Sequence, residues 1–300
     1  MSVRNNEERA GPVPSANSSA ASAASTHQAA QNPKDIANAS NLNFIIPTEF
    51  VELPSQGQFY PKGHPMHGKD TLEIKHMTAK EEDILTSRAL LKKGIAIDRL
   101  LQSIIIDKTV RPHELLVGDK NAIMVSARIS AYGSEYKSRI TCPNCMTVNE
   151  PEIDLSACQK MKYGLSNTEE IEGVEGPSPN GTYLITLPAT KAKVEVKLMN
   201  GADEKRFSDR LQYRKKNRQP DAMLTDQIKT FTVAINGTPM GPKVFGFIDN
   251  MPIRDSRFLR NTYNKLTPVV ELKHNFCCDN CAYEQEVEVP ITAQFFWPDS

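Results

Sequence analysis

The chain has 300 residues, and its 36 lysines and arginines balance 36 aspartates and glutamates, so the formal net charge at pH 7 is zero. A neutral chain has no overall field that would attract nucleic acid or an anionic membrane, which favours a protein partner slightly. No stretch approaches the roughly 18 apolar residues of a membrane span, and no apolar segment follows the N-terminus as in a secretory signal. We therefore expect a protein that is made and used in a cytoplasm, with no membrane contact.

The first 43 residues differ in composition from the rest of the chain. They are rich in Ala, Ser, Asn and Gln and contain no aromatic residue. Such a segment cannot bury enough apolar surface to offset the entropy lost on ordering. All eleven Phe, all eight Tyr and the single Trp lie in the remainder, which is long enough for a sizeable core. We expect a disordered arm over residues 1–43, followed by an α+β region.

Residues 44–158 are predicted to form a first lobe, in which a strand hairpin precedes three helices. The sequence Thr78-Ala-Lys-Glu81 is a capping box, which marks a helix start, and Gly94 suits a left-handed helix end. Asp119 is expected as the N-cap of the third helix. The expected strands are Phe44–Tyr60 and Leu72–His76, and the expected helices are 79–93, Asp98–Ile106 and Asp119–Gly133.

A second lobe with the same order of elements is predicted over residues 183–300. The intervening residues 159–182 are acidic and rich in Gly and Pro, as is typical of a connecting loop. Asp255 is expected to cap a helix that carries Phe258 and Leu259 on its apolar face. The other expected elements are a hairpin of Tyr183–Leu187 and Val194–Leu198, a helix from Ala202, an apolar stretch over Met223–Ile235 and a strand over Val269–Phe276.

The two predicted lobes suggest an internal duplication. The distance along the sequence from Cys142 to Cys278 equals the distance between the two expected caps, Asp119 and Asp255. The alternative is that short elements of an α+β chain align by chance. The hypothesis predicts that the two halves share one topology.

Four cysteines form two Cys-x-x-Cys pairs, which are Cys142 with Cys145 and Cys278 with Cys281. Strand-like sequence flanks both pairs, as in a zinc ribbon that is split between distant segments. Four thiolates on two tight turns suit a tetrahedral Zn²⁺, and a complete Cys₄ shell leaves no position for a substrate. In a reducing compartment, paired Cys-x-x-Cys motifs indicate metal before disulfide. The sequence therefore predicts a structural zinc site that joins the two lobes.

Details of the cysteine pattern leave alternatives open. The residue after a zinc knuckle is usually Gly, because the turn needs a positive φ, but Met146 and Ala282 occupy those places. Cys277 could replace Cys278 as a ligand, although only Cys278 has the Cys-x-x-Cys spacing to Cys281. The remaining cysteine, Cys158, is expected to be a small buried apolar residue.

Two further groups of residues are candidate sites. His64 and His67 lie on a loop rich in Gly and Pro and could bind a metal, but without a nearby carboxylate or cysteine they fit exposed turn residues better. The basic run Lys205–Arg218 could contact phosphate, but interspersed acids and the Phe207 and Leu211 stripe favour a solvated amphipathic helix. No dinucleotide-binding, Walker, nucleophile-elbow or zinc-protease motif is present, so we expect no enzyme, no catalytic residue and no small-molecule substrate.

Several long blocks carry a resemblance to a known family. These blocks are Met77–Leu85, Leu90–Gly94, Leu116–Gly133, Asp255–Arg260 and Phe295–Pro298. Together they resemble the baseplate hub protein family of T-even-type, contractile-tailed bacteriophages, over residues 44–300. The resemblance implies a non-enzymatic role in building the central hub of the tail baseplate, with other hub proteins as partners, in the cytoplasm of the infected bacterium. It leaves open whether the protein stays in the virion tail or acts only during assembly.

Two alternatives to the hub role remain from the residues themselves. Zinc ribbons often bind nucleic acid, but the knuckle hairpins lack the interleaved basic and aromatic residues of that use. A thiol-disulfide oxidoreductase would place its first cysteine at a helix N-terminus, where the helix dipole lowers the thiol pKa. The flanking strand sequence disfavours that arrangement.

Overall fold

The computed structural model describes residues 45–164, 171–289, 291 and 293–296. The arm expected over residues 1–43 lies outside this range and stays a prediction. By its contacts the chain divides after Ile45, and Ile46–Ser300 forms one compact unit of mixed helices and strands. No helix among the described residues combines the length and apolar composition that a membrane crossing requires.

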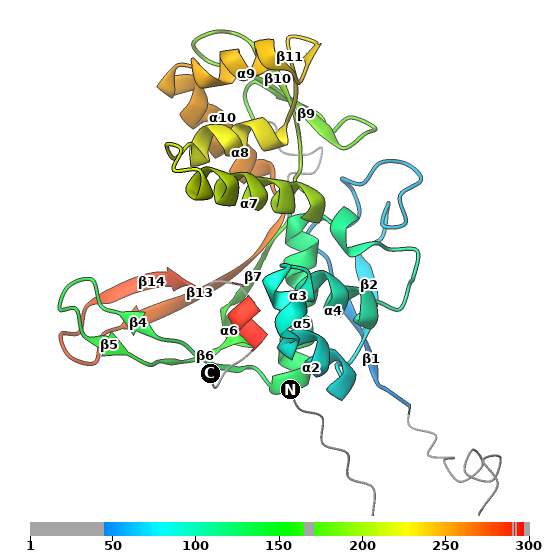
Figure 1. Cartoon of the computed structure of the whole chain (residues 1–300), viewed down its shortest axis with the longest axis vertical. Coiled ribbons are helices and arrows are strands. Elements are labelled where there is room, and N and C mark those ends of the chain that lie inside the picture. Colours follow the sequence, from blue (N-terminus) through cyan, green and yellow to red (C-terminus); the bar gives the residue numbers. More distant parts are fainter. Residues whose placement is uncertain (1–44, 165–170, 290, 292, 297–300) are drawn as a thin grey trace, which may run out of the picture. The chain divides into compact units, whose positions relative to one another are not determined.

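The first part of this unit is a hairpin followed by helices (Figure 1). Strands β1 (Thr48–Glu52) and β2 (Thr71–Lys75) pair antiparallel, as expected. The helices are α2 (Ala79–Thr86), α3 (Arg88–Lys92), α4 (Ala96–Ile104), a 3₁₀ turn η1 (Pro112–Glu114) and α5 (Val117–Tyr132). The single helix expected over 79–93 is therefore wrong. Ser87 is extended and its carbonyl accepts the amides of Leu90 and Leu91, so one helix ends and another begins there.

The later part contains a five-stranded antiparallel sheet in the order β12-β11-β10-β9-β8. Its strands are β8 (Val174–Glu175), β9 (Thr182–Thr186), β10 (Lys193–Lys197), β11 (Thr232–Ile235) and β12 (Thr238–Pro239). Its helices are α7 (Gly201–Lys216), α8 (Met223–Phe231), α9 (Pro242–Asp249) and α10 (Ile253–Leu266). The apolar stretch Met223–Ile235 is thus a helix that runs directly into a strand, because its last residues pair with β10.

Two further hairpins lead to and from the cysteine turns (Figure 1). The first consists of β3 (Glu135–Lys137), β4 (Ile140–Thr141), β5 (Val148–Asn149) and β6 (Glu152–Asp154), and the second of β13 (Val269–Cys277) and β14 (Glu284–Glu288). Their registers coincide when the two cysteine turns are aligned. Lys137 pairs with Glu152 in the first, and the corresponding Lys273 pairs with Glu288 in the second.

The segment expected as a loop over 159–182 contains two strands. β7 (Gln159–Lys162) follows the short helix α6 (Leu155–Cys158) and pairs antiparallel with β13, and β8 pairs with β9. Neither strand has strong local alternation. β7 forms because a strand far along the sequence offers it hydrogen bonds, which local sequence does not reveal.

Asp119 and Asp255 are not the N-caps that the sequence suggested. Leu116 and Pro252 hold those positions, and each aspartate is the third helical residue. Both carboxylates are fully buried. Each binds the turn that follows a distant first strand, where Asp119 accepts one main-chain amide and Asp255 accepts two that would otherwise be buried without partners.

The contacts of the two aspartates correspond. Asp119 accepts the Ser55 amide at 3.0 Å and the Ser55 hydroxyl at 2.6 Å. Asp255 accepts the amides of Ala189 and Thr190 at 2.7 and 2.9 Å and the Thr190 hydroxyl at 2.7 Å. In each half, a long helix is therefore held to the end of the first strand by one buried carboxylate.

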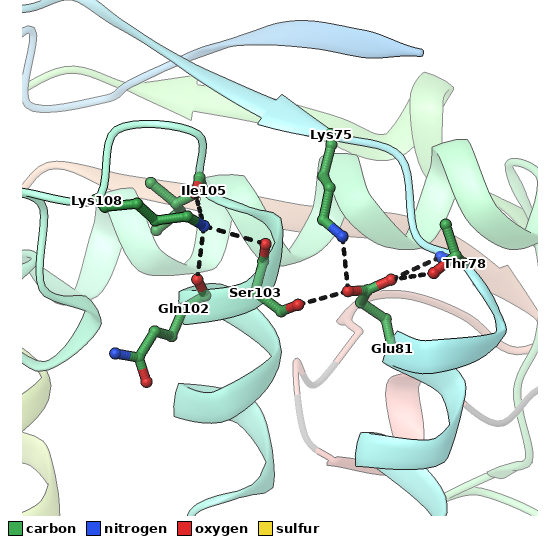
Figure 2. Close-up of polar contacts among 7 residues, drawn as sticks. All are labelled: Lys75, Thr78, Glu81, Gln102, Ser103, Ile105 and Lys108. Atoms are coloured by element: carbon green, nitrogen blue, oxygen red, sulfur yellow. Dashed lines mark hydrogen bonds and ion pairs between the residues drawn. The ribbon is translucent and has the colours of Figure 1, made fainter. Parts of the chain in front are cut away.

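A second buried carboxylate links the hairpin to the first helix in each half. The capping box at Thr78 is present, and its Glu81 lies within 2.8 Å of Lys75 Nζ, at the end of β2 (Figure 2). Ser103, from α4, also donates to Glu81. In the second half Asn200 begins a capping box whose Asp203 lies 2.8 Å from Lys197 Nζ, at the end of β10.

Glu81 is expected to make stability depend on pH. Burial alone would raise the pKa of Glu81, but hydrogen bonds from Lys75, Ser103 and Thr78 outweigh it and lower the pKa to about 2. Because this pKa is lower than in the unfolded chain, the ionised carboxylate stabilises the fold above pH 4.5, and this contribution disappears as pH falls towards 2.

We expect Glu81→Gln to lower the free energy of unfolding by about 2 kcal/mol at pH 7 and by much less at pH 3. Urea unfolding at both pH values measures this difference. The exposed neighbour provides the control, since Glu82→Gln should change stability little at either pH. An equal loss for Glu81→Gln at both pH values would contradict the assignment.

Candidate metal centre

The two Cys-x-x-Cys turns meet, although they lie in opposite halves of the sequence. The Sγ atoms of Cys142, Cys145, Cys278 and Cys281 all lie within 4.8 Å of one another. Cys142 lies 3.7 Å from Cys281, and Cys145 lies 3.5 Å from Cys278. A disulfide would need about 2.05 Å, whereas tetrahedral zinc with bonds of about 2.3 Å places its sulfurs roughly 3.8 Å apart. The spacing fits a shared metal ion, and these four residues could hold one.

Both turns have the same main-chain conformation. The Cys142 carbonyl accepts the Met146 amide at 2.9 Å, and the Cys278 carbonyl accepts the Ala282 amide at 2.9 Å. Met146 has φ 60° and Ala282 has φ 55°. The positive φ that usually selects Gly is therefore present at both positions, and Met146 and Ala282 adopt it with the backbone strain of a residue that has a Cβ atom. The departure from Gly does not alter the turn.

Main-chain amides point at the first sulfur of each turn. The amides of Asn144 and Cys145 hydrogen-bond Cys142, and those of Asn280 and Cys281 hydrogen-bond Cys278. Donors around a sulfur stabilise the thiolate, which is the form that binds metal. The two turns thus present their sulfurs in the same way.

Asn149 supports the site from outside the turns, and sequence reasoning missed it. It is buried, and its amide group lies 3.6 Å from Cys278 Sγ while its carbonyl oxygen accepts the Asp279 amide at 3.0 Å. A residue of the first hairpin therefore positions the second turn. The only sequence signal is a polar residue in a strand directly after the knuckle.

The thiols have unequal acidities. Hydrogen bonds from Thr147 lower the pKa of Cys145 to about 5, whereas burial raises the pKa of Cys142 to about 11. A thiolate at Cys145 thus lies close to Cys142, whose own thiolate form is disfavoured by burial. Four thiolates in this space repel one another unless a cation lies between them, so the donor set fits a metal such as zinc.

Little apolar packing surrounds the cysteines. Cys142, Phe276 and Cys278 form a small buried cluster with Ile140 and Val287 at its edge, separate from the main core. Apart from the sulfurs, the described contacts between the two hairpin ends are this small cluster and polar contacts such as those of Asn149 with Asp279 and of Asn280 with Thr147.

The remaining cysteines do not join the group. Cys277 is exposed at the end of β13, which favours Cys278 as the fourth member. Cys158 is buried, with its sulfur 3.6 Å from the Leu155 carbonyl, as expected of a small apolar residue. Cys142 and Cys278 follow strands and precede turns, so neither has the helix N-terminus of a redox thiol.

His64 and His67 make local contacts in the long turn between β1 and β2. The ring of His64 stacks on Tyr60 at 4.5 Å, and His67 Nδ1 lies 2.8 Å from the Tyr60 carbonyl. His64 is half-buried and His67 is exposed. Among the described residues neither belongs to a group of metal-binding side chains. They stabilise the turn.

The basic run Lys205–Arg218 lies almost entirely on α7. Phe207 and Leu211 are partly buried, and most other side chains of this helix are exposed. Arg214 binds Asp226 of α8 at 2.6 Å, and Arg206 pairs with Asp203. The helix is the solvated amphipathic helix that the sequence favoured, with part of its charge used in ion pairs.

The family comparison covers the unit that contains this site. A family model described as T4 bacteriophage base plate protein matches residues 46–297. Comparisons with curated proteins and with solved structures give no match. The matched range includes both cysteine turns and both sets of helices, and it is more than half of the chain. The chain therefore belongs to the T4 bacteriophage base plate protein family.

Proposed function

We propose that this baseplate protein is a non-enzymatic part or assembly factor of the central hub, and that one structural zinc ion on Cys142, Cys145, Cys278 and Cys281 joins two similar lobes. As a member of a baseplate family, the chain interacts with other phage tail proteins. Hub proteins would be its specific partners, and assembly would take place in the cytoplasm of the infected bacterium. The observation that carries the zinc assignment is the convergence of four sulfurs within 4.8 Å.

Three correspondences support two lobes that arose by duplication. The cysteine hairpins share their register, and the two turns share their hydrogen bonds. In each half a lysine that ends a strand binds the acid of a capping box on the helix that follows. In each half a buried aspartate of a long helix binds the turn after the first strand. Buried polar contacts of the same kind in the same places support duplication over chance alignment of short elements.

The halves differ in sheet size and in lengths. Strands β1 and β2 form a two-stranded sheet, whereas β9 and β10 lie in a five-stranded sheet with β8, β11 and β12. The turn between β1 and β2 is longer than the turn between β9 and β10, and α7 is longer than α2. Insertions in surface turns and at helix ends are well tolerated, so they are compatible with duplication. A zinc ion at the end of both hairpins would fix the end of the first lobe against the end of the second.

A filled Cys₄ shell supports a structural role because it leaves no open coordination position. The four cysteines are also the one cluster of three or more potential metal ligands among the described residues. A nucleic-acid-binding zinc ribbon and a thiol-disulfide oxidoreductase remain as alternatives. No specific observation favours either of them. The cysteines follow strands rather than begin a helix, and the basic helix α7 uses part of its charge in ion pairs within the chain.

Reconstitution with purified hub proteins of the same phage tests the hub role. The full chain is expected to co-elute with a hub protein in gel filtration and to retain one zinc per chain after dialysis. Binding to DNA or RNA that weakens linearly with the logarithm of salt concentration would favour the nucleic-acid alternative instead. Turnover of a disulfide substrate that requires Cys142 would favour the oxidoreductase. Co-elution only with tail proteins outside the hub would refute the hub role.

A further inference from the structure

The outer edge of β1 offers main-chain hydrogen bonds that no described residue takes. Pro47 accepts the His76 amide and Leu53 donates to Asp70, so alternate residues from Pro47 to Leu53 face β2. The amides and carbonyls of Thr48, Phe50 and Glu52 therefore face away from β2. Within the described residues, no hydrogen bond reaches these main-chain groups. An exposed strand edge of this kind is a template for another strand.

The second half shows what covers the equivalent edge. In β9 the corresponding residues Thr182, Leu184 and Thr186 also face away from the hairpin partner, and there β8 pairs with them. The Thr186 amide donates to the Gly173 carbonyl at 2.8 Å, and the Ser178 amide donates to the Thr182 carbonyl at 2.8 Å. The same strand position thus has a neighbouring strand in one half, whereas in the other half no described strand pairs with it.

The side chains beside this edge include an exposed aromatic ring and two carboxylates. Phe50 is 71% exposed, although its counterpart Leu184 is only half-exposed. The register places Glu73 of β2 directly across from Phe50, and Glu52 lies on the same face of the hairpin. No described lysine or arginine lies within ion-pair distance of Glu52 or Glu73. This face therefore has Phe50 at its centre, with the Glu73 carboxylate across from it and Glu52 beside it. Glu52 also accepts the Tyr163 hydroxyl at 2.6 Å, and Lys75, at one end of the face, is paired with Glu81.

We propose that the outer edge of β1 receives an extended segment of another tail protein, which adds a strand to the hairpin. The segment would place an apolar side chain against Phe50 and basic side chains beside Glu52 and Glu73. Main-chain hydrogen bonds supply affinity in such strand addition, and the alternate side chains supply specificity. The proposal uses the family assignment and is independent of the hub role and of zinc.

Phe50→Pro tests this edge directly. Proline removes the outward amide, and its ring blocks an incoming strand, but edge strands tolerate it. The variant should keep the melting temperature of the native chain. In cells infected with phage that lacks this protein, supplying the variant should yield about tenfold fewer complete tails than the native chain, as loss of one hydrogen bond and steric exclusion imply. Phe50→Tyr should support normal tail numbers.

Leu184→Pro is the matched control, because the same substitution in β9 removes an amide that faces β8. It should lower the melting temperature. A comparable loss for Phe50→Pro would overturn the proposal, since the amide of Phe50 would then have a partner within the chain. Normal tail numbers with Phe50→Pro would overturn it as well.

Hydrogen exchange of the full chain distinguishes a tail-protein segment from the other possible occupants of the β1 edge, which are a second copy of the chain and the chain's own residues. The amides of Phe50 and Glu52 should exchange rapidly in the purified protein at all concentrations. Protection that rises with protein concentration would identify a second copy of the chain as the occupant. Protection of these amides at every concentration would show that a segment of the same chain occupies the edge. Either result would replace the proposed tail-protein segment.

Discussion

Cys281→Ser is expected to release the bound metal and to destabilise the ends of both cysteine hairpins. Metal analysis should find one zinc per native chain after dialysis and none in the variant. The unfolding free energy should fall by several kcal/mol, because binding of structural zinc contributes directly to folding stability. The same loss is expected for Cys142→Ser, since each turn supplies two of the four sulfurs.

Loss of the metal should first loosen the ends of the cysteine hairpins and should affect the main core less. Among the described residues, the hairpin ends share a small apolar cluster around Phe276 and a few polar contacts, whereas the main core lies elsewhere and involves both halves of the chain. Without metal, amide exchange should accelerate over 135–154 and 269–288 and change little in α5 and α10. Hub assembly should then fail indirectly, because the ends of the two cysteine hairpins would lose their fixed position.

Cys277→Ser provides the control for this experiment. Cys277 is adjacent to a proposed ligand but exposed and outside the sulfur cluster. The substitution should leave zinc content and melting temperature unchanged. If native protein contains no zinc and Cys281→Ser is as stable as the native chain, the four cysteines have no metal-binding role.

The cysteine turns could be placed from sequence because their information is local. A Cys-x-x-Cys motif between strands defines a turn, and the equal sequence offset of the cysteines and the two aspartates aligned the hairpins correctly. The supporting role of Asn149 could not be predicted in this way. Its contact to Cys278 depends on the meeting of two hairpins that are distant in sequence.

The helix starts show why local rules fail where a buried group has a distant partner. An aspartate before an apolar helix is a good N-cap, and Asp119 and Asp255 fit that pattern. Each instead lies one turn deeper, where Asp119 accepts the Ser55 amide and Asp255 accepts the amides of Ala189 and Thr190. The local preference is about 1 kcal/mol, whereas buried amides without partners cost more.

The blocks that carry the family resemblance contain these buried polar groups. Glu81, Asp119, Arg128 and Asp255 all lie in such blocks, and all four are fully buried. Two blocks that are far apart in sequence also meet directly, since Arg128 donates to the carbonyl of Phe295 at 3.1 Å. The resemblance therefore rests on residues that hold the fold together rather than on a catalytic or binding site.

Arg128→Met is accordingly expected to be one of the most destabilising single substitutions in the chain. The guanidinium is fully buried in α5 and donates to three carbonyls, those of Gly133 at 2.8 Å, Phe295 at 3.1 Å and Glu135 at 3.2 Å. It also lies over the ring of Tyr132, at 5.2 Å from the centroid. Methionine fills similar volume but donates no hydrogen bond, so three carbonyls would lose their partner.

Each such carbonyl costs about 1–3 kcal/mol, so the unfolding free energy should fall by about 3 kcal/mol or more. Urea unfolding measures this change. Arg128→Lys should be intermediate, because an ammonium group cannot reach three carbonyls in the fixed planar geometry of a guanidinium. Arg139→Met is the surface control, since Arg139 is exposed and pairs only with the exposed Glu150 in the described region.

The effect of Arg128→Met should extend to the C-terminal 3₁₀ turn, η2 (Ala293–Phe296). The rings of Phe295 and Tyr136 lie 5.4 Å apart, so the arginine secures both the turn and the start of the first cysteine hairpin. Amide exchange near Phe295 should therefore rise even under conditions in which the core stays folded. A variant as stable as Arg139→Met, with unchanged exchange at Phe295, would show that these carbonyls find other partners and that packing alone holds the C-terminal turn.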